Sequence, residues 1–197
     1  MKKIINIGLA AFMLFAIGAC GGKEDGVKSV KIGSQVWMAE NLNDASKGGK
    51  CHNDKSENCE KYGRLYTWDE AMKACPTGWR LPSDKEWQAL VDFAGGKEVA
   101  GKKLKAKSGW EKGGNGSDEY GFSALPGGDG RFNDTGNNGY WWSSTKCDEC
   151  PDYEENDPNG KYAYFLVIGS LMDELLLGES DISEWWCSVR CIKTSEP

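Results

Sequence analysis

The pattern of hydrophobic and polar positions predicts two consecutive helices, which begin at Thr67 and Ser83. Each start is a capping box: the hydroxyl accepts from the amide three residues later, and the glutamate at that position bonds back. The first helix should end before Pro76, because proline disfavours helical geometry in the residue that precedes it. The second should run to about Phe93, before a Gly-Gly pair. A short helical turn is expected at residues 100–105.

Apolar segments on both sides of these helices predict strands. Residues 30–38 contain the two-residue turn Gly33-Ser34 and indicate a β-hairpin. Residues 109–139 are rich in Gly, Asn and Asp, which predicts a long loop region. Helices followed by antiparallel strands indicate an α+β protein, with two helices packed on a twisted antiparallel sheet and long Gly-rich loops. Further strands are expected at residues 140–145, 161–168, 171–177 and 184–193.

The N-terminal region predicts export and a lipid anchor. Residues 1–19 hold two lysines, an apolar run too short to span a membrane, and small residues before Cys20. This is the pattern of a lipoprotein signal peptide, after which Cys20 carries acyl chains. Residues 20–27 are expected to form a flexible tether. Its Lys23-Glu24-Asp25 resembles the acidic signal that sends lipoproteins of the Bacteroidetes to the outer face; the alternative is a plain solvated linker.

Composition adds a domain count and excludes one class of partner. The 197 residues carry a formal net charge of −6, which becomes −8 once Lys2 and Lys3 leave with the signal peptide. The remainder suits one domain, at residues 28–193, with a tail at 194–197. No basic patch with interleaved aromatics is present, so a nucleic acid is not expected as a partner. Nine tryptophans and 26 glycines indicate a loop-rich fold around an aromatic core.

Six blocks carry a resemblance to a known family: Tyr62–Trp68, Cys75–Trp87, Ala100–Lys105, Gly121–Gly128, Gly139–Thr145 and Ser188–Cys191. In this order they resemble the major paralogous domain named after Fibrobacter succinogenes (FISUMP), a bacterial surface-protein family related to the C-type-lectin-like fold. The resemblance covers roughly residues 28–193. It implies a C-type-lectin-like fold and no settled biochemistry, since a fold defines no function without a site.

Seven cysteines follow Cys20 in a chain that we expect to be exported, and disulfides persist outside the cytosol. Cys51 and Cys59 bracket a polar insert and indicate a local bridge. The family resemblance implies a long-range bridge between Cys75 and Cys191, which ties the two ends of the fold together.

The remaining cysteines leave one thiol unpaired. Cys187 and Cys191 lie in one predicted strand, roughly 13 Å apart, which is too far for a disulfide. Any of Cys147, Cys150 and Cys187 can be the odd one. We predict a Cys147–Cys150 bridge within a loop, and a free, buried Cys187.

The sequence contains few residues that are candidates for catalysis. His52 is the only histidine, which argues against a catalytic triad and against a multi-histidine zinc site. The segment from Trp186 to Cys191 is similar to the reactive cysteine pair of the formylglycine-generating oxidase, which has a related fold, but its spacing is one residue shorter. We therefore expect a protein that is not an enzyme, with an oxidase of this kind as the remote alternative.

The insert at residues 147–160 holds six acidic side chains, and hard oxygen ligands at this density suit calcium. The insert lacks both the EF-hand order and the lectin Glu-Pro-Asn motif, so a solvated acidic loop is the alternative. A second group of oxygens, at residues 133–138, fits turn chemistry first. No other cofactor is expected. The candidate calcium ligands are Asp148, Glu149, Asp152 and Asp157.

The tryptophans are the main candidates for ligand binding. The doublets Trp141-Trp142 and Trp185-Trp186 lie in predicted strands, where neighbouring side chains point to opposite faces. One ring of each doublet can then face a groove, where a flat indole suits a sugar ring or a protein partner. The alternative is that the sheet is covered on both sides and all four rings are buried. Candidate binding residues are Trp110, Trp142 and Trp186; the expected core tryptophans are Trp37, Trp68, Trp79 and Trp87.

Together these observations predict a non-catalytic binding module, lipid-anchored at the outer membrane and facing the cell exterior. Glycan is the first ligand class to test. The alternative is a structural or protein-interaction component of the outer envelope. An indole exposed in a concave surface would favour the binding module, since loops on a rigid scaffold commonly carry recognition.

Overall fold

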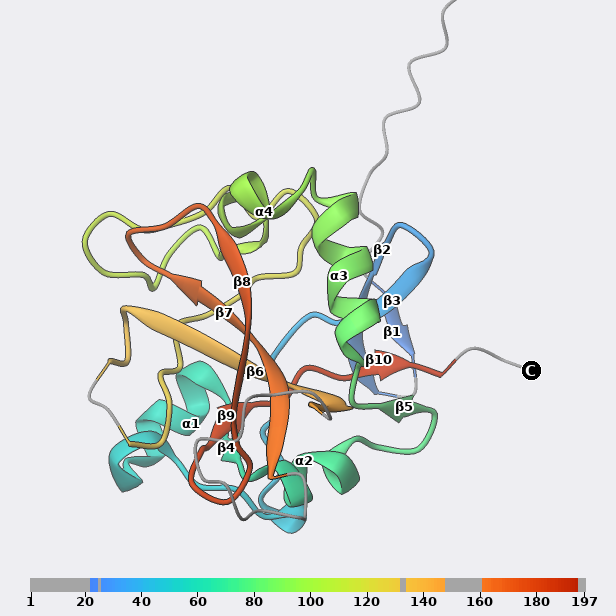
Figure 1. Cartoon of the computed structure of the whole chain (residues 1–197), viewed down its shortest axis with the longest axis vertical. Coiled ribbons are helices and arrows are strands. Elements are labelled where there is room, and N and C mark those ends of the chain that lie inside the picture. The colour runs from blue at the N-terminus through green and yellow to red at the C-terminus, as the bar shows by residue number, and fades with distance from the viewer. Residues whose placement is uncertain (1–21, 25, 132–133, 148–160, 195–197) are drawn as a thin grey trace, which may run out of the picture.

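The computed structural model describes residues 22–24, 26–131, 134–147 and 161–194. They form a mixed α+β fold with four α-helices and two mostly antiparallel sheets (Figure 1). The first sheet has the strand order β1-β2-β3-β10-β5, and the second has the order β4-β9-β6-β7-β8. The α+β class is confirmed. The expectation of two helices on a single sheet was wrong, because short strands from distant segments assemble a second sheet.

The first sheet gathers short strands from both ends of the domain. The β2–β3 hairpin turns at Gly33-Ser34 as predicted, with Ile32 opposite Gln35. Strand β10 lies between β3 and β5, so the end of the domain closes against its beginning (Figure 1). The strands are β1 (Gly22–Glu24), β2 (Val27–Ile32), β3 (Gln35–Met38), β5 (Trp79–Arg80) and β10 (Ile192–Lys193).

Strand β1 occupies part of the segment predicted to be a flexible tether. Gly22 pairs with Ser29, and Glu24 pairs with Val27. The prediction was wrong for these residues, because β2 offers an open edge and backbone ladder bonds form whatever the side chains are.

The second sheet contains the long strands. Strands β6, β7 and β8 form an antiparallel meander, and β9 pairs with β6 in parallel at Trp141 and Ser188. The strands predicted at 140–145 and 161–168 are confirmed. The strand predicted at 171–177 begins only at Leu175, because the preceding turn directs its Met172 carbonyl to the ammonium of Lys105, 2.9 Å away. The strands are β4 (Leu65–Tyr66), β6 (Asn138–Lys146), β7 (Tyr162–Gly169), β8 (Leu175–Asp181) and β9 (Cys187–Ser188).

Residues 184–193, predicted as one strand, are divided between the two sheets. Strand β9 ends in the second sheet and β10 begins in the first. Between them the Arg190 side chain turns inward and is fully buried. Its guanidinium donates to Asn41 Oδ1 at 2.7 and 3.0 Å and to the carbonyls of Met38 and Phe122. The single-strand prediction was wrong because these buried acceptors draw the chain from one sheet to the other.

The two central helices are confirmed as α2 (Trp68–Ala74) and α3 (Asp84–Phe93), and both have the predicted capping boxes. The turn expected at 100–105 is longer, because α4 (Lys97–Leu104) begins right after a glycine pair.

Helix α1 (Ser56–Tyr62) was not predicted. It lies in the polar insert and has no side-chain hydrogen bond at its N-cap, so it lacks a local start signal. Two short 3-10 turns precede it, at Ala45–Lys47 and His52–Asp54.

The interior contains two aromatic clusters, one on each side of the second sheet. One surrounds the rings of Trp37 and Trp87, whose centroids are 4.7 Å apart; the other surrounds Tyr66 under α2. The expected core tryptophans are all buried: Trp37, Trp68, Trp79 and Trp87.

Among the described residues, disulfides join Cys51 to Cys59 and Cys75 to Cys191, and Cys187 is free and buried. Cys150 lies outside the described residues, so its bridge to Cys147 stays a prediction. The signal peptide and Cys20 also lie outside the described residues. Within the described ranges, no helix combines the length and the apolar character needed to cross a membrane.

Candidate ligand-binding surface

Two of the three candidate tryptophans are buried. The Trp142 side chain is 0% exposed, and its indole N–H donates to the carbonyl of Tyr66 at 2.8 Å. Trp110 is 5% exposed and donates to the carbonyl of Ala124 at 2.9 Å. The expectation of exposed rings here was wrong: the second sheet, which carries Trp142, is covered on both faces, and Trp110 packs from a loop into the cluster around Trp37. Trp141 belongs to one buried cluster, and its neighbour Trp142 belongs to the other.

Trp186 is the candidate that stays partly exposed. It lies directly before β9, and the ammonium of Lys50 is 4.3 Å from the centroid of its ring. The same ammonium donates to the carbonyl of Gly130 at 3.3 Å. A Cβ at position 130 would come within 2.6 Å of the Trp186 Cβ, so only glycine permits this close approach.

Trp185 is also partly exposed and carries a cation of its own. Its ring stacks on Phe165 with centroids 5.3 Å apart, and the guanidinium of Arg131 is 4.4 Å from its centroid. Arg131 in turn donates to the carboxylate of Glu184 at 3.1 Å. We call the surface formed by Trp185, Trp186, Lys50, Gly130 and Arg131 the doublet surface.

Sequence reasoning found one residue of the doublet surface as a ligand candidate and missed the two cations. Lys50 and Arg131 lie far from the tryptophans in the chain, and neither sits in a recognisable motif. A cation over an indole face adds electrostatic attraction to the ring and occupies part of it. The surface therefore offers indole edges and positive charge together, and differs from the bare aromatic platform that the sequence suggested.

Below the doublet surface lie buried groups that hold their protons at neutral pH. Burial raises the pKa of the Cys187 thiol well above its usual value, and the carboxylate of Asp129 adds to this. Burial also raises the pKa of Tyr140, with Asp134 as the next cause. Because the thiolate is the reactive form of cysteine, Cys187 is poorly suited to act as a nucleophile here.

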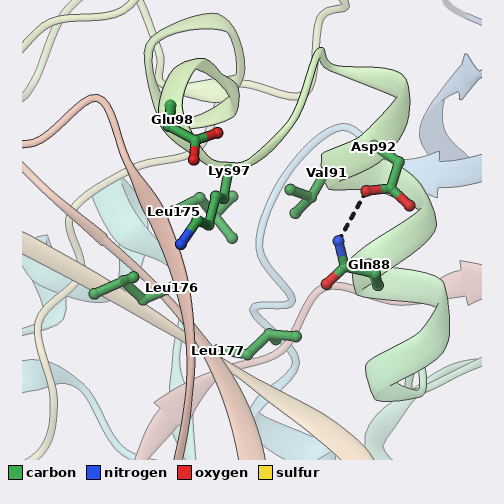
Figure 2. A pocket seen from close by; sticks show the side chains of 8 residues that line it. All are labelled: Gln88, Val91, Asp92, Lys97, Glu98, Leu175, Leu176 and Leu177. Atoms are coloured by element: carbon green, nitrogen blue, oxygen red, sulfur yellow. Dashed lines mark hydrogen bonds between the residues drawn. The ribbon is translucent and has the colours of Figure 1, made fainter.

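A surface pocket of about 470 Å³ lies between α3, α4 and β8. Figure 2 shows Leu175, Leu176 and Leu177 of β8 on one side of it, and Gln88 and Asp92 of α3 on the other. The amide of Gln88 donates to the Asp92 carboxylate at 2.8 Å, so the α3 rim is polar.

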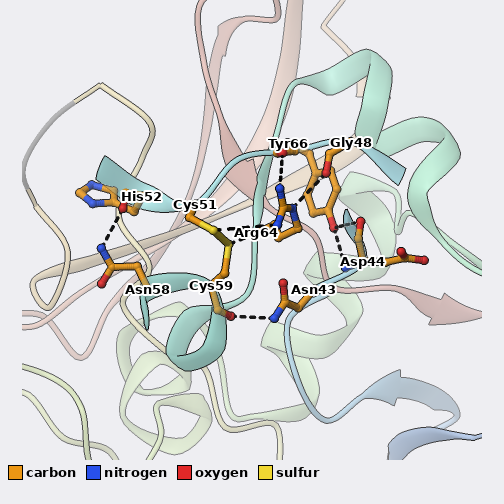
Figure 3. Close-up of a disulfide and its surroundings, with 10 residues drawn as sticks. Asn43, Asp44, Gly48, Cys51, His52, Asn58, Cys59, Arg64 and Tyr66 are labelled. Atoms are coloured by element: carbon orange, nitrogen blue, oxygen red, sulfur yellow. Dashed lines mark hydrogen bonds between the residues drawn. A yellow bond between two sulfur atoms is a disulfide. The ribbon is translucent and has the colours of Figure 1, made fainter. Parts of the chain in front are cut away.

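A second pocket, of about 410 Å³, lies beside the C-terminal end of α1. One of its lining residues is Cys59, whose bridge to Cys51 is shown in Figure 3. Arg64 braces this bridge: its guanidinium donates to the carbonyls of Gly48 and Gly49 at 3.1 and 2.8 Å and lies 3.7 Å from the Cys59 sulfur.

All four ligands of the candidate calcium site lie outside the described residues. Within the described part of the chain, no group of three or more His, Cys, Asp or Glu residues is arranged to hold a metal ion. The second oxygen group is a turn: the Asp134 carboxylate accepts from the Asp129 amide and the Asn138 side chain. Asn133 lies outside the described residues. The unplaced ligands are Asp148, Glu149, Asp152 and Asp157.

A comparison with protein families identifies the class of the chain. The sequence model of the Fibrobacter succinogenes major domain matches residues 30–193. The match spans most of the chain, so the protein belongs to this family, as the six sequence blocks indicated. No curated protein and no solved structure matches the chain. The matched range includes the doublet surface and both pockets.

Proposed function

We propose that this protein is a non-catalytic binding module displayed at the cell surface, and that the doublet surface contacts its ligand. One observation carries the proposal: two neighbouring, partly exposed tryptophans, each beside a cation, stand on a scaffold closed by a long-range disulfide. Partly exposed indoles supply large contact areas at little conformational cost, which suits recognition.

The first ligand class to test is a glycan, and the local charge favours an acidic one. Lys50 and Arg131 bring positive charge to one surface of a chain whose formal net charge is −6. A polysaccharide that carries carboxylates would meet the ammonium of Lys50 and compete with Glu184 for Arg131, while its sugar rings pack against the exposed parts of the indoles.

The test is a pull-down of the full-length protein on insoluble polysaccharides, neutral and acidic, and a glycan-array screen, with and without calcium. We expect Trp186→Ala and Lys50→Gln each to weaken binding about tenfold or more, as at interaction hot spots. Met72→Ala, an exposed apolar position on α2, is the control. Undiminished binding by a folded Trp186→Ala protein would refute the role of the doublet surface.

A protein-interaction role is the alternative, and one observation favours it. Leu171, Met172 and Leu176 are exposed large apolar side chains of the β7–β8 region, and Leu176 lines the pocket between α3 and β8. Clustered exposed apolar residues can mark protein contacts. If the glycan screens are silent and an envelope protein co-purifies with the wild type but not with Leu171→Ser/Leu176→Ser, this role replaces the binding module.

The absence of catalysis is part of the same proposal. The oxidase alternative needs two reactive thiols near the C-terminal end of the domain. Here Cys191 is bonded to Cys75, and Cys187 is buried with a raised pKa. These contacts support a structural role for both sulfurs. Activity on a cysteine-containing peptide, lost in Cys187→Ser, would revive the alternative.

The proposed location is the outer membrane, through acyl chains on Cys20 and with the domain facing outward. Strand β1 begins at Gly22, two residues after Cys20, so an acylated Cys20 can lie at most about 7 Å from the sheet. Globomycin should leave unprocessed precursor, and Cys20→Ser should abolish acylation. Full protection from protease on intact cells would contradict the outward orientation.

We also propose that the domain has the C-type-lectin-like fold that the resemblance implies. Supporting features are the meeting of both chain ends in one sheet and the long loop region between α4 and β6. The disulfide from the end of α2 to the last strands adds to these. An experimental structure whose strands connect in another order would overturn the assignment.

A further inference from the structure

We infer that the pocket beside α1 is a separate site for a neutral saccharide. Its volume of about 410 Å³ lies within the range of roughly 300–1,000 Å³ that small-molecule sites occupy. Three segments build it: the stretch after β3, the C-terminal end of α1, and the loop around residues 123–125. It shares no residue with the doublet surface, so it does not depend on the function proposed above.

The inner wall of this pocket is rigid because Asn41 is fully engaged. Its Oδ1 accepts from the Trp141 indole at 2.8 Å and from Arg190 at 2.7 and 3.0 Å, and its Nδ2 donates to the Tyr62 carbonyl at 2.8 Å. Gly63 packs against it at φ +81°, where a Cβ would lie 2.7 Å from the Asn41 Cβ. Neither residue can shift without disturbing the buried guanidinium.

The two side walls of the pocket are held as firmly as its inner wall. Asn43 donates to the carbonyl of Cys59 at 2.9 Å, and Cys59 is fixed by its disulfide. On the other side, Ser123 adopts φ +51°, with its amide and hydroxyl 2.7 and 2.6 Å from the Asp118 carboxylate. Such a backbone conformation costs free energy in a residue other than glycine and persists only where the surroundings over-determine it. Rigid walls spare a ligand the cost of ordering its site.

The lining chemistry selects the class of ligand. Glu40 and Glu60 supply acceptors and Lys61 supplies a donor, whereas Ala39 and Leu125 are apolar. Sugar hydroxyls donate and accept, so they can satisfy both kinds of group, and the C–H face of the ring can cover the apolar residues.

The charges around the pocket further restrict the class of ligand that it can bind. With Glu40 paired to Lys28, the remaining charges at the rim are one carboxylate, Glu60, and one ammonium, Lys61, and this balance favours a neutral ligand. The Glu40 carboxylate is paired with Lys28 at 2.6 Å, whereas in the described part of the chain the carboxylate of Glu60 has no hydrogen-bond or ion-pair partner. Glu60 is therefore the acceptor that a ligand hydroxyl can reach without breaking an existing contact.

The test titrates the full-length protein with glucose, galactose, mannose, xylose and cellobiose, followed by saturation-transfer NMR and calorimetry. We expect at least one to bind. Glu60→Gln, which keeps the shape and removes the charge, should weaken this binding about fivefold or more, and Leu125→Phe, which fills the pocket, should abolish it. Trp186→Ala should leave it unchanged. Thermal unfolding of each variant verifies that it is folded.

A second variant addresses the rigidity of the wall. Cys51→Ala/Cys59→Ala removes no polar group of the rim and frees α1, so the affinity should fall while saturating binding remains. If the affinity for the sugar is unchanged both in this variant and in Glu60→Gln, the assignment of this pocket as a saccharide site is refuted.

The two proposals can fail independently. Binding lost in Trp186→Ala but normal in both pocket variants would overturn this inference and keep the doublet surface. No binding of any sugar in the panel also overturns it, as does preferential binding of a lysine-containing peptide at this pocket. The polysaccharide pull-down tests the doublet surface separately.

Discussion

Removing the long-range disulfide should cost this domain about twice the free energy that removing the short one costs. The Cys75–Cys191 bridge joins residues 116 apart in the sequence, and the Cys51–Cys59 bridge joins residues 8 apart. In the chain-entropy model, each bridge stabilises by restricting the unfolded chain, and the effect grows with the logarithm of loop length. The model gives about 4.8 kcal/mol for the long loop and about 2.5 kcal/mol for the short one at 25 °C.

The perturbations are Cys75→Ala/Cys191→Ala and Cys51→Ala/Cys59→Ala, with Cys187→Ala as control. Cys187 is buried and forms no bridge, so its replacement measures the loss of a packed sulfur alone. Urea denaturation followed by tryptophan fluorescence gives the free energy of unfolding and the m-value of each protein. Because small domains are stable by about 5–15 kcal/mol, the long-bridge variant should lose a large part of its stability.

Equal losses for the two double variants would refute the loop-length reasoning, and so would a larger loss for the short bridge. If Cys187→Ala lowers the free energy of unfolding as much as the long-bridge variant does, the effect comes from lost packing and not from the disulfide. A changed m-value in the long-bridge variant is expected, because an uncrosslinked unfolded chain exposes more surface.

Three further predictions concern buried and local interactions. Arg190→Met should cost about 2–5 kcal/mol in urea denaturation, because two buried backbone carbonyls lose their donor; a cost below 1 kcal/mol would contradict this account. Thr67→Ala and Ser83→Ala should each cost about 1 kcal/mol, while Ser108→Ala, at an exposed serine outside the helices, should change the stability little and gives the baseline. The raised pKa of Cys187 means that the folded state keeps a proton that the unfolded state releases above pH 9, so stability should fall as pH rises past that value. Cys187→Ala should reduce that fall, and thiol labelling at pH 8 should require denaturant.

Local sequence alone determined the central helices and the first hairpin. The capping boxes at Thr67 and Ser83 and the turn at Gly33-Ser34 involve residues at most a few positions apart, so their hydrogen bonds form wherever the chain goes next. Helix α1 lacks such a signal. It depends on a disulfide and on Asn43, which lies outside the helix. No pattern within the segment itself therefore predicts it.

Only the tertiary structure decided which tryptophans are exposed. Alternation along a strand places Trp141 and Trp142 on opposite faces, but it says nothing about whether each face is covered. Here both faces carry a buried cluster. The doublet surface likewise depends on Lys50 and Arg131, which the fold brings to the indoles from distant segments. The same is true of residues 184–193, where the buried acceptors of Arg190 lie far away in the sequence and divide one apparent strand between two sheets. Contacts of this kind form only when the chain has closed, since no periodicity within a segment encodes its distant partner.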